Sequence, residues 1–368
     1  MLQRLAIKVS GIVQGVGFRP YVYRLASRLN LAGLVRNDSR GVEIEIQGEY
    51  NQVKKFVKIL NEQPPPLALI TEIQSNAIPV RTESEFKIIG SSAEQQKSTL
   101  ISPDIAVCDD CRQELFDPHD RRYLYPFINC TNCGPRYTII TGIPYDRPRT
   151  SMADFNMCEN CRQEYENPSD RRFHAQPEAC PVCGPQVFLR DNKGTECSGD
   201  PLRKVIEFLQ QGSIIAIKGI GGFHLAVLAQ DTAAVQKLRE RKHRFEKPLA
   251  LMVRDPVTAA KLACLNEEEQ VLLASLQRPI VLCRKKEDTG ISALVSLDNN
   301  YLGLMLPYSP LHEILFRLGN FDALVMTSAN ISEEPICHQN EECRQGWERS
   351  LIIFWNITVI FISVATTQ

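Results

Sequence analysis

The sequence lacks an excess of charge of either sign, and its first residues lack the pattern of a secretory leader. Its 42 lysines and arginines balance 43 aspartates and glutamates, which leaves a formal net charge of -1. Such a chain has no global field that would draw it onto nucleic acid or an anionic membrane, so only a local basic patch is left open. The N-terminus, MLQRLAIKVSG, has neither the apolar core nor the small-residue cleavage site of a signal peptide. We therefore expect a cytoplasmic protein.

Long apolar runs are also scarce. The strongest candidate, residues 351–364, has only fourteen residues and contains three polar ones, Asn356, Thr358 and Ser363. It is shorter than the roughly 20 apolar residues that span a bilayer, so we expect no membrane-spanning segment. Because the chain changes character abruptly after residue 350, we expect 350–368 to be a divergent tail produced by a frameshift or a premature stop.

Cysteine, by contrast, is abundant and regularly spaced along the sequence. Eight of the thirteen cysteines form four Cys-x-x-Cys pairs inside an internal repeat, in which CDDCRQELFDPHDRRYLYPFINCTNCGPR returns as CENCRQEYENPSDRRFHAQPEACPVCGPQ. Two such pairs complete a tetrahedral shell of four thiolates, which predicts two structural zinc sites in a finger module at 104–190. Disulfides are the alternative, and sequential and interleaved pairing are both open. The expected ligands are Cys108, Cys111, Cys130, Cys133, Cys158, Cys161, Cys180 and Cys183.

Other polar residues of the repeat carry weaker signals. The two Asp-Arg-Arg motifs, 120–122 and 170–172, are expected to form surface ion pairs, which is the usual role of such runs. His119 and His174 occupy different positions of the repeat, so we do not expect them to be metal ligands.

Residues 1–90 alternate strand-like and helix-like patterns in the order β-α-β-β-α-β, which is typical of a ferredoxin-like split βαβ domain. A linker follows at 91–103. The first strand leads into GIVQGVGFRP, where backbone N–H groups and a helix start can form an anion cradle and Arg19 adds a planar fork. The loop lacks the Gly-Lys-Ser/Thr of a Walker motif, and Pro20 replaces the third glycine of a dinucleotide fingerprint. A plain tight turn with a surface arginine is the alternative.

Residues 198–349 read as an α/β domain with three polar clusters at strand ends: KGIGGFHL, RERKHRFEKPLALM and TSAN. Because ligands gather at strand ends of open α/β sheets, these clusters are predicted to converge on one phosphate-rich ligand. A solvated charged helix face is the alternative reading of the basic run. The whole chain is therefore expected to be an α+β multidomain protein.

Two family resemblances sharpen these predictions. VQGVGFRP followed by GLVRNDSRGVEIEIQG resembles the acylphosphatase family, which implies that Arg19 holds a phosphate and Asn37 orients the attacking water. KGIGGFHL, KHRFEKPLALM, SPLHEIL and TSANISEEP resemble the YrdC-type domain, which binds ATP and makes carbamoyl adenylates. The positions matching its nucleotide site are Lys242, Arg244, Lys247, Ser328 and Asn330, with Lys218 in the corresponding first loop.

The order of the three modules resembles the HypF family of hydrogenase maturation carbamoyltransferases, as far as about residue 343. The resemblance implies that carbamoyl phosphate is hydrolysed first and that the carbamate then reacts with ATP, which is expected to bring Mg²⁺. It also implies that the carbamoyl group passes to a cysteine of the partner HypE. The family's kinase-like fourth domain is expected to be missing here. Two other functions stay open: an RNA-binding zinc-finger protein, and an inactive fragment.

Overall fold

The computed structural model describes residues 1–91, 100–330, 335–347 and 353–357. It divides into two compact units: residues 1–104 with 129–184, and residues 105–128 with 185–368. Each unit is thus made from two separate stretches of chain, and the predicted finger module is divided between them. Among the described residues, no helix is both long and apolar enough to cross a lipid bilayer.

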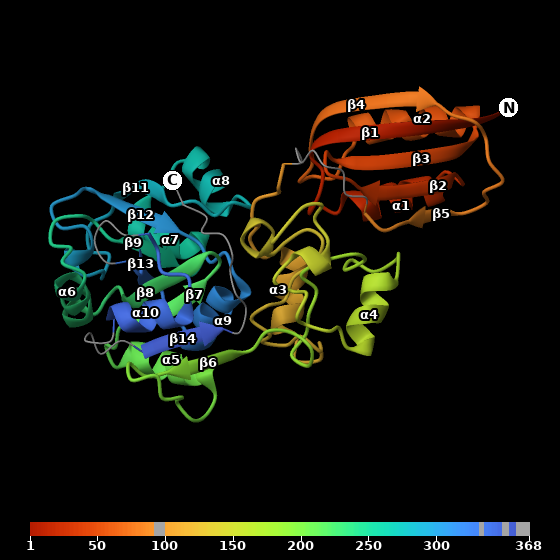
Figure 1. The fold of residues 1–368 in the computed structure, drawn as a ribbon. Helices are drawn as coiled ribbons and strands as arrows, with labels where there is room; N and C mark the ends of the chain where they lie inside the picture. Colours follow the sequence, from red (N-terminus) through yellow and green to blue (C-terminus); the bar gives the residue numbers. More distant parts are fainter. Residues whose placement is uncertain (92–99, 331–334, 348–352, 358–368) are drawn as a thin grey trace. The chain divides into compact units, whose positions relative to one another are not determined.

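Unit 1 begins with a five-stranded sheet whose strand order is β4-β1-β3-β2-β5 (Figure 1). Strand β1 pairs antiparallel with β3 and β4, β2 pairs antiparallel with β3, and β2 pairs parallel with β5. This is the expected ferredoxin-like arrangement. Its elements are β1 (Leu2–Ile12), α1 (Phe18–Arg28), β2 (Ala32–Asn37), β3 (Val42–Glu49), α2 (Tyr50–Glu62), β4 (Leu69–Ala77) and β5 (Phe86–Ile88).

The core of this domain lies between the sheet and its two helices. Alternate residues of β1 and β3, such as Ile7, Val9 and Ile44, are at most 1% exposed, and Val22 of α1 and Phe56 of α2 pack into the same cluster. This follows from the period of two in the strands and the 3.6-residue period in the helices. The predicted order of strands and helices did not include β4, because most of its residues are exposed and do not alternate between apolar and polar.

The rest of unit 1 contains 3₁₀ turns at Tyr137–Ile139 and Arg147–Arg149 and the helix α4 (Glu159–Glu166). The Asp-Arg-Arg motif of this repeat was expected to form surface ion pairs, but one of its two arginines is buried. Arg172 is 4% exposed and its Nε donates to the Asn129 carbonyl at 3.0 Å. Asp170 instead accepts from the Arg172 backbone N–H at 2.7 Å. The motif therefore closes a turn and buries a guanidinium.

Unit 2 contains a nine-stranded mixed sheet of order β10-β11-β12-β9-β13-β8-β7-β14-β6 (Figure 1). Its strands are β6 (Val187–Arg190), β7 (Ile215–Gly219), β8 (Gly222–Leu228), β9 (Ala250–Val253), β10 (Ala263–Cys264), β11 (Val281–Lys285), β12 (Tyr301–Met305), β13 (Ala323–Ser328) and β14 (Ile353–Ile357). Its helices are α3 (Asp109–Phe116), α5 (Pro201–Gln210), α6 (Thr232–Arg241), α7 (Pro256–Leu262), α8 (Glu267–Ala274), α9 (Pro310–Gly319) and α10 (Asn340–Trp347), with a 3₁₀ turn at Ala293–Val295.

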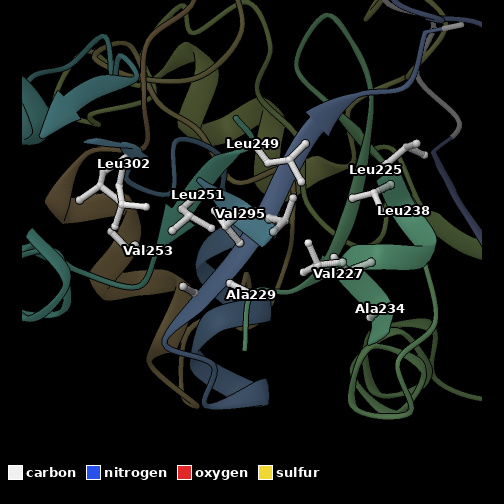
Figure 2. Close-up of a cluster of buried hydrophobic side chains, with 14 of the residues drawn as sticks. Leu225, Val227, Ala229, Ala234, Leu238, Leu249, Leu251, Val253, Val295 and Leu302 are labelled. Atoms are coloured by element: carbon white, nitrogen blue, oxygen red, sulfur yellow. The ribbon is translucent and has the colours of Figure 1, made fainter. Parts of the chain in front are cut away.

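Local sequence explains where several of these helices begin. Helices α5, α7 and α9 each start with a proline after an Asp or Ser whose side chain accepts a hydrogen bond from the first turn. Proline suits the first helical position because its missing N–H would have no intrahelical partner there. The main core packs α6 against the sheet, and Figure 2 shows Leu238 of α6 beside Leu225 and Val227 of β8.

The predicted tail, 350–368, falls mostly outside the described residues. The exception is β14, which pairs parallel with β7 and antiparallel with β6. These five residues thus belong to the sheet of unit 2. The expected origin of the tail in a frameshift or premature stop stays a prediction.

Candidate active sites

The glycine-rich loop of unit 1 turns directly into helix α1. Gly15 and Gly17 adopt positive φ values of 75° and 70°, a region that favours glycine, and Gly17 is the N-terminal cap of the helix. Arg19 follows in the first turn and is 8% exposed. The loop thus places a guanidinium beside the N-terminus of a helix, where unpaired N–H groups attract anions.

Asn37 lies at the end of β2, and its side chain donates to the same carbonyl oxygen as the side chain of Arg19. The Asn37 Nδ2 donates to the Tyr145 carbonyl at 3.1 Å, and the Arg19 Nη2 donates to the same oxygen at 3.4 Å. Asn37 is 1% exposed, and its Oδ1 has no partner among the described residues. The two residues predicted to act on an acyl phosphate are therefore brought together, and one buried acceptor is left open.

Two residues of the predicted finger module, Tyr145 and Asp146, complete this site, and no motif in the sequence points to them. Asp146 Oδ1 lies 2.8 Å from Arg19 Nη1, and Asp146 Oδ2 accepts from Ser91. Gln14 joins the parts: its Oε1 accepts from the Tyr145 N–H at 2.8 Å, while its Nε2 donates to the Asp38 and Gly41 carbonyls. The only local signal was Gln14 itself, in the loop motif.

A small cavity of about 20 Å³, open to solvent, lies at this point. Gln14, Arg19, Asn37 and Tyr145 line it together with His174. Burial, helped by the Arg19 charge, lowers the pKa of His174 to about 4, so its imidazole is neutral near pH 7. The remaining lining residues are Val13, Gly15, Gly17, Phe18, Pro20, Thr131, Arg136, Ala175 and Gln176.

A second cavity, of about 360 Å³, lies in unit 2 between the end of α6 and the end of β13. Its lining includes five of the six predicted nucleotide-site residues, and the sequence analysis did not single out the others. The lining residues are Lys242, His243, Arg244, Phe245, Glu246, Lys247, Ser328 and Asn330. The structure therefore brings these five positions together, and their binding of a nucleotide stays a prediction.

Lys242 builds the wall of this cavity. Its Nζ donates to the Ser328 carbonyl at 2.6 Å, and to the Asn330 carbonyl and Oδ1 at 2.9 Å each. All three donors of the ammonium are thereby used. Burial, followed by repulsion from Arg244, lowers the pKa of Lys242 to about 8. The basic run is therefore not a solvated helix face at this position, since Lys242 is only 9% exposed.

Lys218 does not line the cavity. Its Nζ donates to Asn340 Oδ1 at 2.8 Å and lies 5.4 Å from the centre of the Phe223 ring. Burial lowers the pKa of Lys218 to about 8 as well. The predicted sixth member of the nucleotide site is thus a second buried lysine held by α10.

The eight paired cysteines fall into two groups, one in each repeat. The second group, Cys158, Cys161, Cys180 and Cys183, lies wholly in unit 1, and its four sulfur atoms are within 4.8 Å of one another. It joins the two pairs of one repeat, which is sequential pairing. Its Sγ–Sγ distances of 3.6–3.7 Å are far above a disulfide bond length of about 2.05 Å. They match the edge of a tetrahedron with Zn–S bonds of about 2.3 Å, so this group fits zinc, and it does not include His174. Of the first group, Cys130 and Cys133 belong to unit 1, with their sulfur atoms 3.8 Å apart, and Cys108 and Cys111 belong to unit 2.

Comparison with protein families gives three matches. An acylphosphatase model matches residues 5–88, a HypF finger model matches 107–140 and 157–190, and a Sua5/YciO/YrdC model described as telomere recombination matches 207–363. The last match runs past residue 343, where the resemblance was expected to fade.

Relatives extend over nearly the whole chain. It is 49% identical over 359 residues to carbamoyltransferase HypF2 of Cupriavidus necator, covering 93% of this chain and 44% of the relative. It is 48% identical to carbamoyltransferase HypF of Synechocystis sp., covering 92% and 44%. A crystal structure of full-length HypF in the phosphate- and nucleotide-bound form matches with a TM-score of 0.95 and 47% identity, covering 99% and 47%. The chain thus spans less than half the length of these relatives.

Proposed function

Because this chain belongs to the HypF carbamoyltransferase family, we propose that it carries the first two reactions of carbamoyl transfer in nickel–iron hydrogenase maturation. The first is hydrolysis of carbamoyl phosphate at the Arg19 site. The second is formation of carbamoyl-AMP from carbamate and ATP at the cavity in unit 2. The observation that carries the proposal is the convergence of Arg19 and Asn37 on one carbonyl oxygen beside a glycine-rich helix start.

At the first site, the phosphate of carbamoyl phosphate lies against the loop N–H groups, the start of α1 and the Arg19 guanidinium. Asn37 Oδ1 accepts a hydrogen bond from a water and orients its lone pair toward the substrate. The water attacks the phosphorus, and the bond from phosphorus to the carbamoyl oxygen breaks. Carbamate leaves as an anion, and the phosphate keeps the oxygen and the protons of the water. No covalent nucleophile is needed, because an acyl phosphate is already activated and positioning with charge stabilisation lowers the barrier.

At the second site, a carbamate oxygen attacks the α-phosphorus of ATP, and the bond to pyrophosphate breaks. Arg244 and Lys247 line the cavity and supply positive charge toward the phosphates. Mg²⁺ accompanies ATP as its usual counter-ion. Lys242 fixes the Ser328–Asn330 wall, because each of its donors already has an acceptor there.

The finer assignments of the partner and the location rest on the family. We propose that the carbamoyl group passes on to a cysteine of HypE, and that the two cysteine groups each hold one zinc ion. Thiolate clusters of this kind suit a reducing compartment, which supports the cytoplasmic location.

RNA binding, the alternative function, is not favoured. The relatives are carbamoyltransferases, and the basic run offers few exposed charges to a nucleic-acid backbone. Arg239 is 3% exposed and donates to backbone carbonyls, and Lys242 is bonded to the cavity wall.

The test measures phosphate release from carbamoyl phosphate, and pyrophosphate release from ATP with and without carbamoyl phosphate. The proposal expects Arg19→Ala to abolish phosphate release and Lys242→Ala to spare it while abolishing carbamoyl-phosphate-dependent pyrophosphate release. Arg28→Ala on the same helix and Lys261→Ala on α7 change exposed residues and are the matched controls. Absence of both activities in the zinc-loaded wild-type chain would reject the proposal for this chain.

A further inference from the structure

The segment Tyr145–Asp146 lies between the two cysteine repeats, yet it contacts both residues proposed to act on carbamoyl phosphate. One residue supplies a main-chain carbonyl to Arg19 and Asn37, and the next supplies a carboxylate to Arg19. The Arg19 and Tyr145 positions are 126 apart in the chain. All of these groups belong to unit 1.

These contacts restrict how the Arg19 guanidinium can lie. Nη1 is held by Asp146 Oδ1 at 2.8 Å and Nη2 by the Tyr145 carbonyl at 3.4 Å, so both terminal nitrogens are fixed from one side. Arginine has five N–H donors in a rigid plane, so the remaining donors keep a defined direction for phosphate oxygens. Asp146 is itself held, because Ser91 donates to its other oxygen.

The same segment decides which end of the Asn37 amide is available. Nδ2 donates to the Tyr145 carbonyl, so Oδ1 is left as the acceptor, buried and without a partner among the described residues. A carbonyl cannot donate, so the opposite amide orientation would set two acceptors against each other. The orientation that remains is the one that can accept a hydrogen bond from a water.

We propose that Asp146 is a positioning residue of the phosphate site, and that the Tyr145–Asp146 segment holds Arg19 and Asn37 in their working orientations. The inference rests on the proposed carbamoyl phosphate hydrolysis. It adds a charge effect that a purely structural contact would lack: the Asp146 carboxylate neutralises Arg19 and repels the incoming phosphate. Asp146 therefore weakens substrate binding somewhat while it holds Arg19 in its working orientation.

The experiment uses the zinc-loaded full chain with Asp146→Asn, Asp146→Ala and the control Asp154→Ala, which changes an exposed acid of the same finger region. Two quantities are measured: kcat for carbamoyl phosphate and the Kd for inorganic phosphate by calorimetry. We expect Asp146→Ala to lower kcat about tenfold, the loss of one charged hydrogen bond, and Asp146→Asn to lower it less because an acceptor remains. Phosphate binds roughly three- to tenfold tighter to both variants, because a negative charge near the site is gone.

The other outcomes overturn the inference in different ways. Lower kcat with weaker phosphate binding means that Asp146 only supports the fold. Unchanged kcat with tighter binding means that it only competes with phosphate, and no change in either quantity removes it from the site. If the wild-type chain hydrolyses no acyl phosphate but Asp146→Asn still binds phosphate more tightly, the proposed reaction fails while the charge contact stands without a positioning role.

Discussion

ATP binding is expected to weaken as pH rises through about 8, far below the range in which an ordinary lysine titrates. The cause is burial, which lowers the pKa of Lys242 to about 8 from the usual 10.5. If only the protonated form closes the Ser328–Asn330 wall, the apparent Kd rises about tenfold between pH 7 and pH 9, following the fraction of protonated lysine.

Calorimetric titration with a non-hydrolysable ATP analogue at pH 7, 8 and 9 measures this effect. Lys242→Met serves as the reference, because its affinity is expected to be weak and to stay the same between pH 7 and pH 9. The reasoning is refuted if the wild-type Kd is flat between pH 7 and pH 9, or if Lys242→Met retains the full pH dependence.

The same lowered pKa of Lys242 affects folding in the opposite direction: it makes the folded state more stable as pH rises. Between about pH 8 and pH 10.5 the unfolded chain binds more protons at Lys242 than the folded chain does, so this residue makes the free energy of unfolding rise with pH in that window. Below pH 8 the cost of burying the charged ammonium is fully present. The contribution is measured as the difference between the wild type and Lys242→Met in urea unfolding at pH 7.5 and 9.5.

Three further predictions concern other parts of the chain. Arg19→Ala should lower kcat/KM for carbamoyl phosphate by about 10²–10³, as expected for the loss of an oriented charge donor in the transition state, and an effect below fivefold contradicts that role. Cys161→Ser should reduce bound zinc from two ions per chain to one by elemental analysis, whereas the exposed Cys264→Ser should retain both. Gly33→Ala should destabilise unit 1 by at least about 3 kcal/mol, because φ is +135° and the new Cβ would lie 2.0 Å from the Glu45 carbonyl; Gly90→Ala, with open space around it, is the control in thermal unfolding.

Some of this protein could be predicted from sequence because the signals are local. The cysteine spacing, the glycine loop before α1 and the strand-end position of Asn37 each lie within a few residues. Tyr145 and Asp146 have no such signal: they sit between the repeats, and their role depends on contacts more than a hundred positions away. Edge strand β4 was missed for a related reason, since it buries too little to show a pattern.

Lys218 shows how strand geometry limits the strand-end argument. It pairs with Phe223 of β8, whereas Ser328 of β13 pairs with His224, the next residue of the same strand. Successive side chains of a strand point to opposite faces. Lys218 and Ser328 therefore start on opposite faces of the sheet, although both lie at strand ends. Sequence located the edge of the sheet but carried no information on register, so it could not show that Lys218 lies outside the lining of the cavity in unit 2; its role in nucleotide binding stays a prediction.

The way the two units share the chain has a consequence for biosynthesis. Unit 2 begins at residue 105, but the chain returns to unit 1 for 129–184 before it supplies the rest of unit 2 from 185 onward. At ribosomal rates of about 5–20 residues per second, the stretch 105–128 emerges about 10–40 seconds before β13 of its unit's sheet does. The two units therefore cannot be completed one after the other as the chain emerges. A nascent chain halted near residue 150 would hold a finished acylphosphatase-like sheet and an orphan fragment of the second unit.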